Sequence, residues 1–209
     1  DFSAFCTLDV TQKDRPEIVS TFYEQIRPAA FSEKVLAEAE KYGALVTVES
    51  NSYGLSVLEH LLQREWAYLY RRTKYDKLAD RWTESLGFNT SLSTRSLLLS
   101  RLQEYIGNSW LGVKDDRLKY EMNTFIFNDN GKPEAAPGKH DDMIFATALA
   151  LIGMDQIDQV EQKRQAERPH NLRAMLQFEL STGKVYSGVQ AELFPEDEPA
   201  DCSPLTMLS

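Results

Sequence analysis

The chain has 209 residues, of which 42% are hydrophobic, and this is enough apolar material for one large domain with its own core. Its two cysteines, Cys6 and Cys202, give neither a disulfide framework nor zinc-ligand spacing, which favours a reducing compartment. The formal net charge of −9 excludes a protein that coats nucleic acid through a broad basic surface, so any DNA contact must be local.

Neither a membrane span nor an ATPase motif is visible in the sequence. The longest apolar run, residues 143–154, is too short and too interrupted to cross a bilayer, and the N-terminus lacks a signal pattern. We therefore expect a soluble intracellular protein with no membrane partner. No G-x-x-x-x-G-K-[ST] run occurs, so these residues do not carry a P-loop ATPase.

The first 70 residues alternate between strand and helix patterns. Strand patterns occur at residues 3–10, 17–26, 44–48 and 67–70, and helix patterns at 30–42 and 54–66. A turn at 12–16 makes the first two strands a hairpin, and Ser32 and Gly43 are the expected N-cap and stop of the first helix. This order predicts an α/β domain whose central mixed sheet is flanked by helices.

The remaining residues extend this pattern toward a polar C-terminus. We expect a loop or exposed turn at 71–84, an amphipathic helix at 93–106, helix or strand at 118–127, a buried helix at 139–153 and a charged helix at 155–167. A late strand is expected at 185–194, and the acidic residues 195–209 have the composition of a disordered tail. The main domain is therefore expected to span 1–168, followed by a packed C-terminal extension at 169–194.

Acidic residues stand at two positions where an isolated charge is costly. Glu49 closes the apolar run 44–48, at the strand end where α/β sheets place their ligand sites. Asp141 and Asp142 open the helix expected to be buried, where ordinary capping is the alternative interpretation. The stripe of small residues that follows slightly favours Asp142 over Asp141 as the inward acid, and both remain candidates.

Convergence of Glu49 with Asp142 would require a cation between them. Like charges at reduced dielectric repel by several kcal/mol unless protons or metal ions intervene. Oxygen-only ligands select Mg²⁺ or Mn²⁺, and two such ions roughly 4 Å apart can bind a phosphate and activate a water. The predicted reaction is therefore phosphodiester hydrolysis with two ions per site.

The residues around these acids form two motifs. The run Val-Thr-Val-Glu-Ser-Asn-Ser-Tyr-Gly at 46–54 is followed about ninety residues later by Gly-Lys-His-Asp-Asp-Met at 138–143. Together they resemble the nuclease domain of terminase large subunits from tailed phages or herpesvirus-like viruses, in which a glutamate of E-x-N-x-x-G and an aspartate of H-D-D help to hold the metals. The resemblance covers residues 1–153, including the first hairpin.

The resemblance implies an RNase H-like nuclease domain at 1–168 that cuts double-stranded concatemeric viral DNA during genome packaging. It also implies an ATPase domain upstream in the same polypeptide, partners in the portal and the small terminase subunit, and a place in the host cell cytoplasm. The family's first catalytic aspartate lies on a strand before the one that starts at Ser3, so we expect it upstream of residue 1. Asp1 is then an outer metal-site residue, and Asp9 a solvated hairpin residue.

Several other polar residues have two interpretations. A cluster of cations interleaved with aromatic residues follows the strand at 67–70, and either tracks DNA phosphates or forms a solvated loop: Arg71, Arg72, Lys74, Lys77 and Arg81. His140 either orients a carboxylate or water or is structural, and Lys139 either contacts a phosphate or has no function. Asn51 is expected to cap the helix that follows it.

Two other functions share parts of this pattern. An RNase H-like structure-specific resolvase has the same chemistry and differs in preferring branched DNA. A non-catalytic docking module would keep the fold and bind the portal or the small terminase through the acidic residues 196–201.

Overall fold

The computed structural model describes residues 2–76, 80–129 and 131–157. The chain divides into two units, 1–162 and 163–209, and all the described residues belong to the first. The expected boundaries at 168 and 194, the strand at 185–194 and the acidic tail lie outside the described residues.

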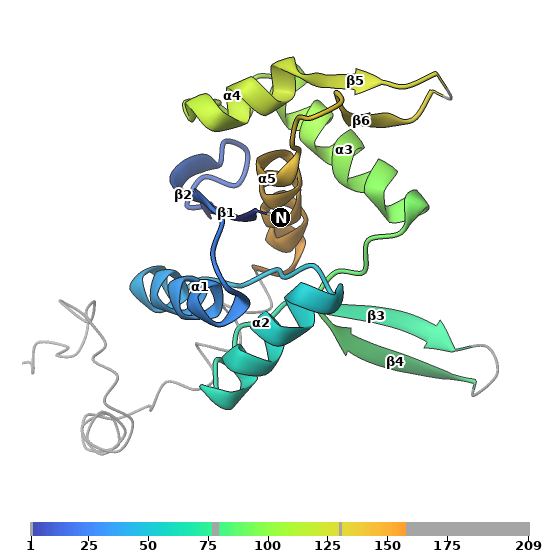
Figure 1. Cartoon of the computed structure of the whole chain (residues 1–209). Helices are drawn as coiled ribbons and strands as arrows, with labels where there is room; N and C mark the ends of the chain where they lie inside the picture. The colour runs from blue at the N-terminus through green and yellow to red at the C-terminus, as the bar shows by residue number, and fades with distance from the viewer. Residues whose placement is uncertain (1, 77–79, 130, 158–209) are drawn as a thin grey trace, which may run out of the picture. The chain divides into compact units, whose positions relative to one another are not determined.

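Helices and short strands alternate along the described chain (Figure 1). In order they are β1 (Ser3–Asp9), β2 (Glu17–Glu24), α1 (Pro28–Tyr42), α2 (Ser52–Gln63), β3 (Arg71–Asp76), β4 (Arg81–Leu86), α3 (Leu92–Gly107), α4 (Asp116–Asn123), β5 (Phe125–Phe127), β6 (Pro133–Ala135), α5 (Asp142–Gly153) and a 3-10 turn, Met154–Gln156. This mixture confirms the α/β class. No helix of the described part is both long and apolar enough to cross a membrane.

The strands form three separate two-stranded antiparallel sheets, β1–β2, β3–β4 and β5–β6. The segments 44–48 and 67–70, expected as full strands, are joined by an isolated parallel bridge from Val46 to Leu69, and a second isolated bridge joins Glu49 to Phe88. The first segment pairs with two different parts of the chain. The Val46 N–H donates to the Tyr68 carbonyl, and further along the Phe88 N–H donates to the Val48 carbonyl. The described residues therefore do not form the single central sheet that the sequence suggested.

The prediction of a loop or exposed turn at 71–84 was wrong. Residues 71–76 and 81–86 form the β3–β4 hairpin, with six paired positions. Tyr75 lies opposite Trp82 with ring centroids 5.3 Å apart, and Arg71 forms an ion pair with Glu84 at 3.5 Å. Such cross-strand pairs stabilise a hairpin that is solvated on both faces, and they leave no apolar alternation to be read. Because most residues of β3 and β4 are charged or polar, the hydrophobic pattern of the sequence does not reveal these two strands.

The ends of the other helices follow the sequence with two exceptions. Gly43 ends α1 in the left-handed conformation, with φ 58°, as expected. Ser32 does not cap α1, which begins at Pro28; its hydroxyl is buried and donates to the Pro28 carbonyl. The helix expected from residue 139 begins at Asp142, and residues 118–127 contain both α4 and β5.

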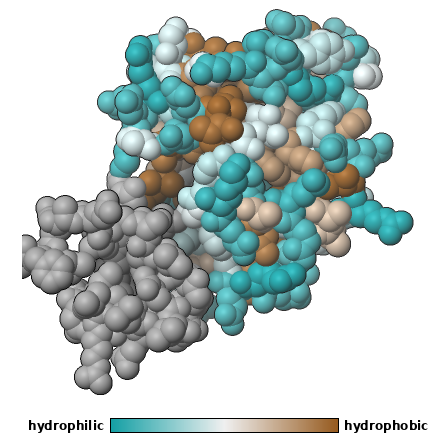
Figure 2. Space-filling view, turned by 90° about the vertical axis from the view of Figure 1, so that its left-hand side faces the viewer, coloured by the Kyte–Doolittle hydropathy of each residue, from teal (hydrophilic) through white to brown (hydrophobic). Residues whose placement is uncertain are grey.

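Two apolar clusters form the core. The larger surrounds α5, where Met143 and Leu151 are fully buried against Leu98 of α3 and Leu118 of α4. The smaller lies between α1 and α2. Val46 and Val48 pack against it from residues 44–49, which are called the bridging segment below. On the face shown in Figure 2, hydrophilic residues cover most of the coloured surface and apolar ones appear in separate patches.

The C-terminal end of α5 lies directly against the bridging segment. A Cβ atom built on Gly153 would lie 2.4 Å from Oγ1 of Thr47, which is too close for real atoms. A larger residue at 153 would therefore require the Thr47 side chain or its segment to shift.

We expect Gly153→Ala to lower the free energy of unfolding by about 1–3 kcal/mol, the usual cost of overpacking. Gly107, which also ends a helix, has open space around its Cβ position, so Gly107→Ala should be neutral or stabilising by up to about 1 kcal/mol. Urea denaturation measures both. Adding Thr47→Ala to Gly153→Ala should recover part of the loss, and equal effects of the two alanine variants would contradict the close contact.

Candidate functional site

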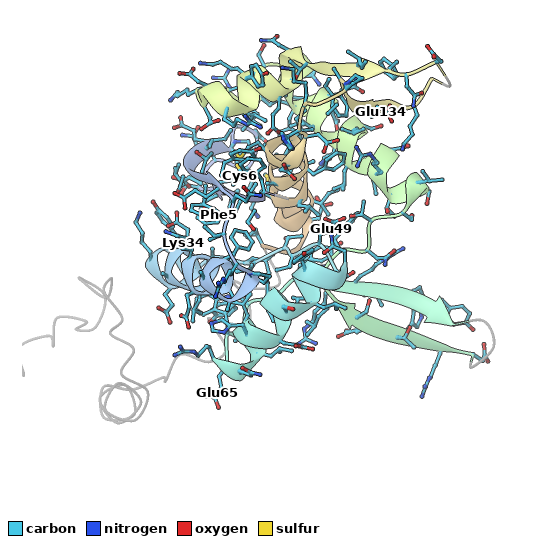
Figure 3. The ribbon with its side chains drawn as sticks, in the orientation of Figure 1. Phe5, Cys6, Lys34, Glu49, Glu65 and Glu134 are labelled. Carbon is cyan, nitrogen blue, oxygen red and sulfur yellow. The ribbon has the colours of Figure 1, made fainter. Side chains whose placement is uncertain are left out.

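Glu49 is restrained by the residue that starts the next helix. Nδ2 of Asn51 donates to Oε2 of Glu49 at 2.9 Å, while Oδ1 of Asn51 accepts the Gly54 N–H at 2.9 Å. Asn51 is thus the N-cap of α2, as expected, and also holds the carboxylate. Figure 3 shows Glu49 beside the N-terminal end of α2.

Gly54 explains the last position of the E-x-N-x-x-G motif. A Cβ atom at this residue would lie 1.6 Å from the carbonyl oxygen of Glu49. The first turn of α2 therefore rests against the backbone of Glu49, and no side chain fits between them. All three motif residues serve one local structure, in which a helix start fixes the position of the acid.

The two candidate aspartates at the start of α5 have different partners. Asp141 accepts a hydrogen bond from Nη2 of Arg95 at 2.6 Å, in a pair with about a quarter of each side chain exposed. Asp142 is the first residue of the helix, and Oδ2 lies 3.8 Å from Nδ1 of His140. The structure therefore commits Asp141 to an arginine and leaves Asp142 with a weaker contact.

Glu121 of α4 is the acid of this region that sequence reasoning missed. Its side chain is fully buried, and Oε2 accepts the backbone N–H groups of Met143 at 2.8 Å and Ile144 at 3.3 Å. Asp141 makes no capping bond with its side chain, so Glu121 provides the cap of α5 from another helix. Only its spacing of four from Arg117 could have indicated a role, and this spacing is equally typical of an exposed pair.

Arg117 compensates the buried charge. Nε donates to Glu121 at 2.9 Å, and Nη2 donates to the hydroxyl of Tyr23 at 2.6 Å. The guanidinium lies 4.0 Å from the centroid of the Tyr23 ring, which stacks on Phe2. Through these contacts the first hairpin, α4 and the start of α5 are held together.

The pKa of Asp142 is raised above its ordinary value of 3.8. Burial is the largest cause, followed by the negative charges of Glu121 and Asp141, while His140 and Arg117 act in the opposite direction. Glu49 is not among the charges that act on Asp142. In the ranges described, no group of three or more His, Cys, Asp or Glu residues is arranged to hold a metal. That Glu49 and Asp142 share a cation stays a prediction.

The remaining candidates lie around these acids. Asp1 lies outside the described residues. His140 is exposed to 45% and meets the ring of Phe2 edge-on at 4.9 Å between centroids. Asp9 is exposed, and the pKa of its carboxyl is lowered by hydrogen bonds from the hydroxyl and amide of Thr11. This confirms Asp9 as a solvated hairpin residue.

The basic candidates are divided between the faces of the β3–β4 hairpin. The register places Arg72 and Arg81 on the face opposite the Tyr75–Trp82 pair, and Arg71 pairs with Glu84. Lys74 lies in β3, and Lys77 is outside the described residues. Apart from the hairpin, Nζ of Lys139 donates to the hydroxyl of Tyr120 at 2.7 Å.

Comparison of the sequence with models of protein families found no match, and comparison with curated proteins found none either.

Replacing Asn51 separates its two roles. Asn51→Ala should lose about 1 kcal/mol of unfolding free energy, the usual cost of removing an N-cap. Asn51→Ser keeps a side-chain acceptor for Gly54 N–H and removes the donor to Glu49 without adding a charge beside that carboxylate, so its stability in urea should stay close to wild type. Ser91→Ala, which removes the N-cap of α3, is the matched control for cap loss alone. An equal loss in both Asn51 variants would show that the Glu49 contact, rather than the cap, stabilises α2.

The raised pKa of Asp142 gives a stability difference with a definite sign. The folded state binds this proton more tightly, so the stability from it is present below pH 3.8 and is lost as the pH rises through the higher folded-state pKa. In EDTA, Asp142→Asn should therefore be more stable than wild type at pH 7, and the gain should shrink as the pH falls toward 4.

Asp116 is the matched control, because it is the first residue of α4 as Asp142 is of α5. Lys119 lowers the pKa of Asp116 through a hydrogen bond and its charge. Asp116→Asn should thus lose stability at pH 7 and match wild type at low pH. Urea denaturation across this range measures both variants, and a shared sign would contradict the assignment.

Proposed function

We propose that this chain is the nuclease domain of a terminase large subunit, a metal-dependent endonuclease that cuts double-stranded concatemeric viral DNA. In this proposal the fold is RNase H-like, and an ATPase domain precedes it in the same polypeptide. The domain acts in a packaging complex with the portal and the small terminase subunit in the host cell cytoplasm.

The observation that carries the proposal is the surplus of acids at the start of α5. Glu121 and Asp141 both act on Asp142 there, and two arginines form ion pairs with these two neighbours: Arg117 with Glu121 and Arg95 with Asp141. Asp142 keeps a raised pKa, with only the 3.8 Å contact to His140 among its described ion pairs. Burial is the largest cause of this raised pKa and the charges of Glu121 and Asp141 add to it, so a divalent cation bound to Asp142 would offset both effects.

Glu49 and Asp142 are the proposed ligands of Mg²⁺ or Mn²⁺, with two ions per site. When bound, these ions would supply an activated water and stabilise the leaving 3′ oxygen. The chain itself supplies oxygen ligands: Asn51 orients the carboxylate of Glu49, and Glu121 fixes the helix start that carries Asp142. Asp141 is the less favoured ligand because Arg95 already binds it.

The length of α5 bears on the distance that a site built from both Glu49 and Asp142 would have to span. Thr47 abuts Gly153 at the far end of the helix, about 16 Å from Asp142 at 1.5 Å per residue. Glu49 is two residues beyond Thr47 in the sequence, and two ions roughly 4 Å apart would extend the reach between its carboxylate and that of Asp142. Direct contact between the two acids is therefore not required by the proposal.

The central experiment is plasmid cleavage by the full-length protein in Mn²⁺. Wild type should nick and linearise the plasmid, and Glu49→Gln or Asp142→Asn should reduce the rate by at least about 100-fold, the order expected for loss of a ligand that acts in the transition state. Asp9→Asn removes an exposed acid and should cut like wild type. Circular dichroism verifies that each variant is folded.

Cleavage retained by both ligand variants would remove these residues from the mechanism. Cleavage confined to branched DNA would favour a structure-specific resolvase with the same chemistry.

A further inference from the structure

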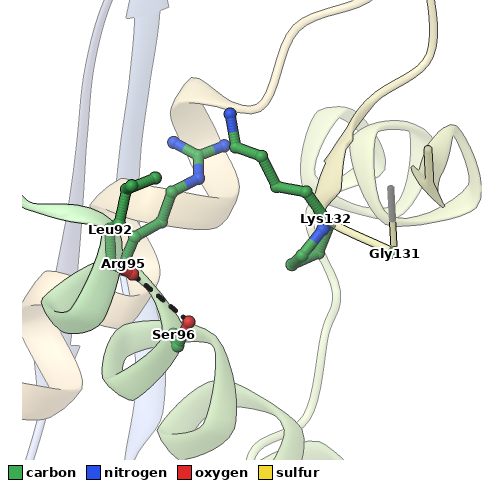
Figure 4. Close-up of a pocket in the computed structure, with 6 residues that line it drawn as sticks. Leu92, Arg95, Ser96, Gly131 and Lys132 are labelled. Carbon is green, nitrogen blue, oxygen red and sulfur yellow. Dashed lines mark hydrogen bonds between the residues drawn. The ribbon is translucent and has the colours of Figure 1, made fainter. Parts of the chain in front are cut away.

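We propose that a small cavity between α3 and the β5–β6 hairpin binds a phosphodiester group of the DNA backbone, an inference that rests on the proposed function. The cavity has a volume of about 270 Å³ and is lined by Leu92, Arg95, Ser96, Gly131, Lys132 and Pro133. Figure 4 shows the side chains of Arg95 and Lys132 extending toward the same space from opposite walls. None of these residues was singled out by the sequence motifs.

Arg95 is held in a fixed orientation beside the cavity. Nη2 donates to Asp141 at 2.6 Å, and the guanidinium carbon lies 4.0 Å from the centroid of the Phe145 ring. The buried Nε atom makes no hydrogen bond within the part of the chain that the structure describes. A guanidinium has five N–H donors, so one carboxylate contact does not exhaust it. An arginine already oriented by an acid and a ring loses little freedom when it binds an oxyanion.

Lys132 provides a second, more mobile cation. Its Nζ lies 3.8 Å from Oε2 of Glu134, in a pair exposed to 49% and 39%. A pair so exposed contributes little, so the ammonium can turn toward a ligand at small cost. A Cβ atom on Gly131 would meet nothing within 4 Å, which keeps the mouth beside Lys132 open. An anion in the cavity would interact favourably with both cations.

The wall formed by α3 adds a further positive contribution. Leu92 is the first residue of this 16-residue helix, so the cavity lies at the end where the helix dipole favours anions. The cavity thus has two cationic side chains and a helix N-terminus in its walls, with one acid paired to each cation, Asp141 to Arg95 and Glu134 to Lys132.

The position of the cavity indicates which anion would bind there. Asp141 connects Arg95 to the residue immediately before Asp142, the proposed metal ligand. A phosphate bound by Arg95 and Lys132 would therefore lie on the Asp142 side of the proposed cutting site, where it would be a neighbour of the scissile phosphate on the same strand. Free inorganic phosphate has the same chemistry and is distinguished by experiment.

The test measures duplex binding by fluorescence anisotropy, with the full-length protein in EDTA and several salt concentrations. Removing one phosphate contact should reduce the slope of log K against log salt by about 1. We expect this for Lys132→Gln and for Arg95→Gln, with severalfold weaker binding at fixed salt. Lys132→Gln is the decisive variant because Lys132 is half exposed and its loss should not affect folding. Arg64→Gln removes an exposed arginine paired with Glu33 and should leave the slope unchanged.

An unchanged slope in Lys132→Gln, or a wild type that does not bind the duplex, would overturn the proposal. Titration with inorganic phosphate, followed by NMR, is the second arm. Backbone shifts at the cavity that vanish in Lys132→Gln, with no change in duplex binding, would assign the site to free phosphate and overturn the DNA assignment. Because no cleavage occurs in EDTA, failure here is independent of failure of the Glu49 and Asp142 variants in Mn²⁺.

Discussion

The buried carboxylate of Glu121 is the interaction on which the candidate site depends. This carboxylate lies in the interior, where it accepts hydrogen bonds from Arg117 and from two backbone N–H groups at the start of α5. A helix start that is buried without such a partner leaves its N–H groups unsatisfied. Because the partner comes from α4, the position of Asp142 is set by the packing of two helices rather than by local sequence.

This arrangement has an electrostatic consequence for the acids around it. The cap of α5 is normally supplied by the residue before the helix, which is Asp141 here. With Glu121 in that role, Asp141 is free to orient Arg95, and Asp142 remains beside two like charges. Capping by Glu121 therefore leaves Asp141 available for the Arg95 ion pair and adds the charge of Glu121 to burial, which is the largest cause of the raised pKa of Asp142.

The sequence revealed features that depend on local geometry. Asn51 as a cap, Gly43 as a helix stop and the span of α3 all follow from propensities within a few residues. The features that the sequence did not reveal depend on contacts between residues distant in the chain. The β3–β4 hairpin is stabilised by cross-strand pairs that no periodicity reveals, and the burial of Glu121 depends on α5, which begins 21 residues later. The segments at 44–48 and 67–70 have strand-like composition but form only isolated bridges, since pairing also depends on which neighbours are present.

The two candidate ligands are connected through opposite ends of α5. Its first turn is fixed by Glu121, and its last residue, Gly153, rests against Thr47, two residues before Glu49. Packed helices and strands move as rigid elements, so the separation of Glu49 from Asp142 is controlled by a contact that neither acid makes. A methyl group added at Gly153 would meet the Thr47 side chain, and a shift of residues 44–49 in response would change that separation without altering either acid in the sequence. Geometry at a site of this kind therefore depends on small residues distant from the chemistry, as well as on the acids themselves.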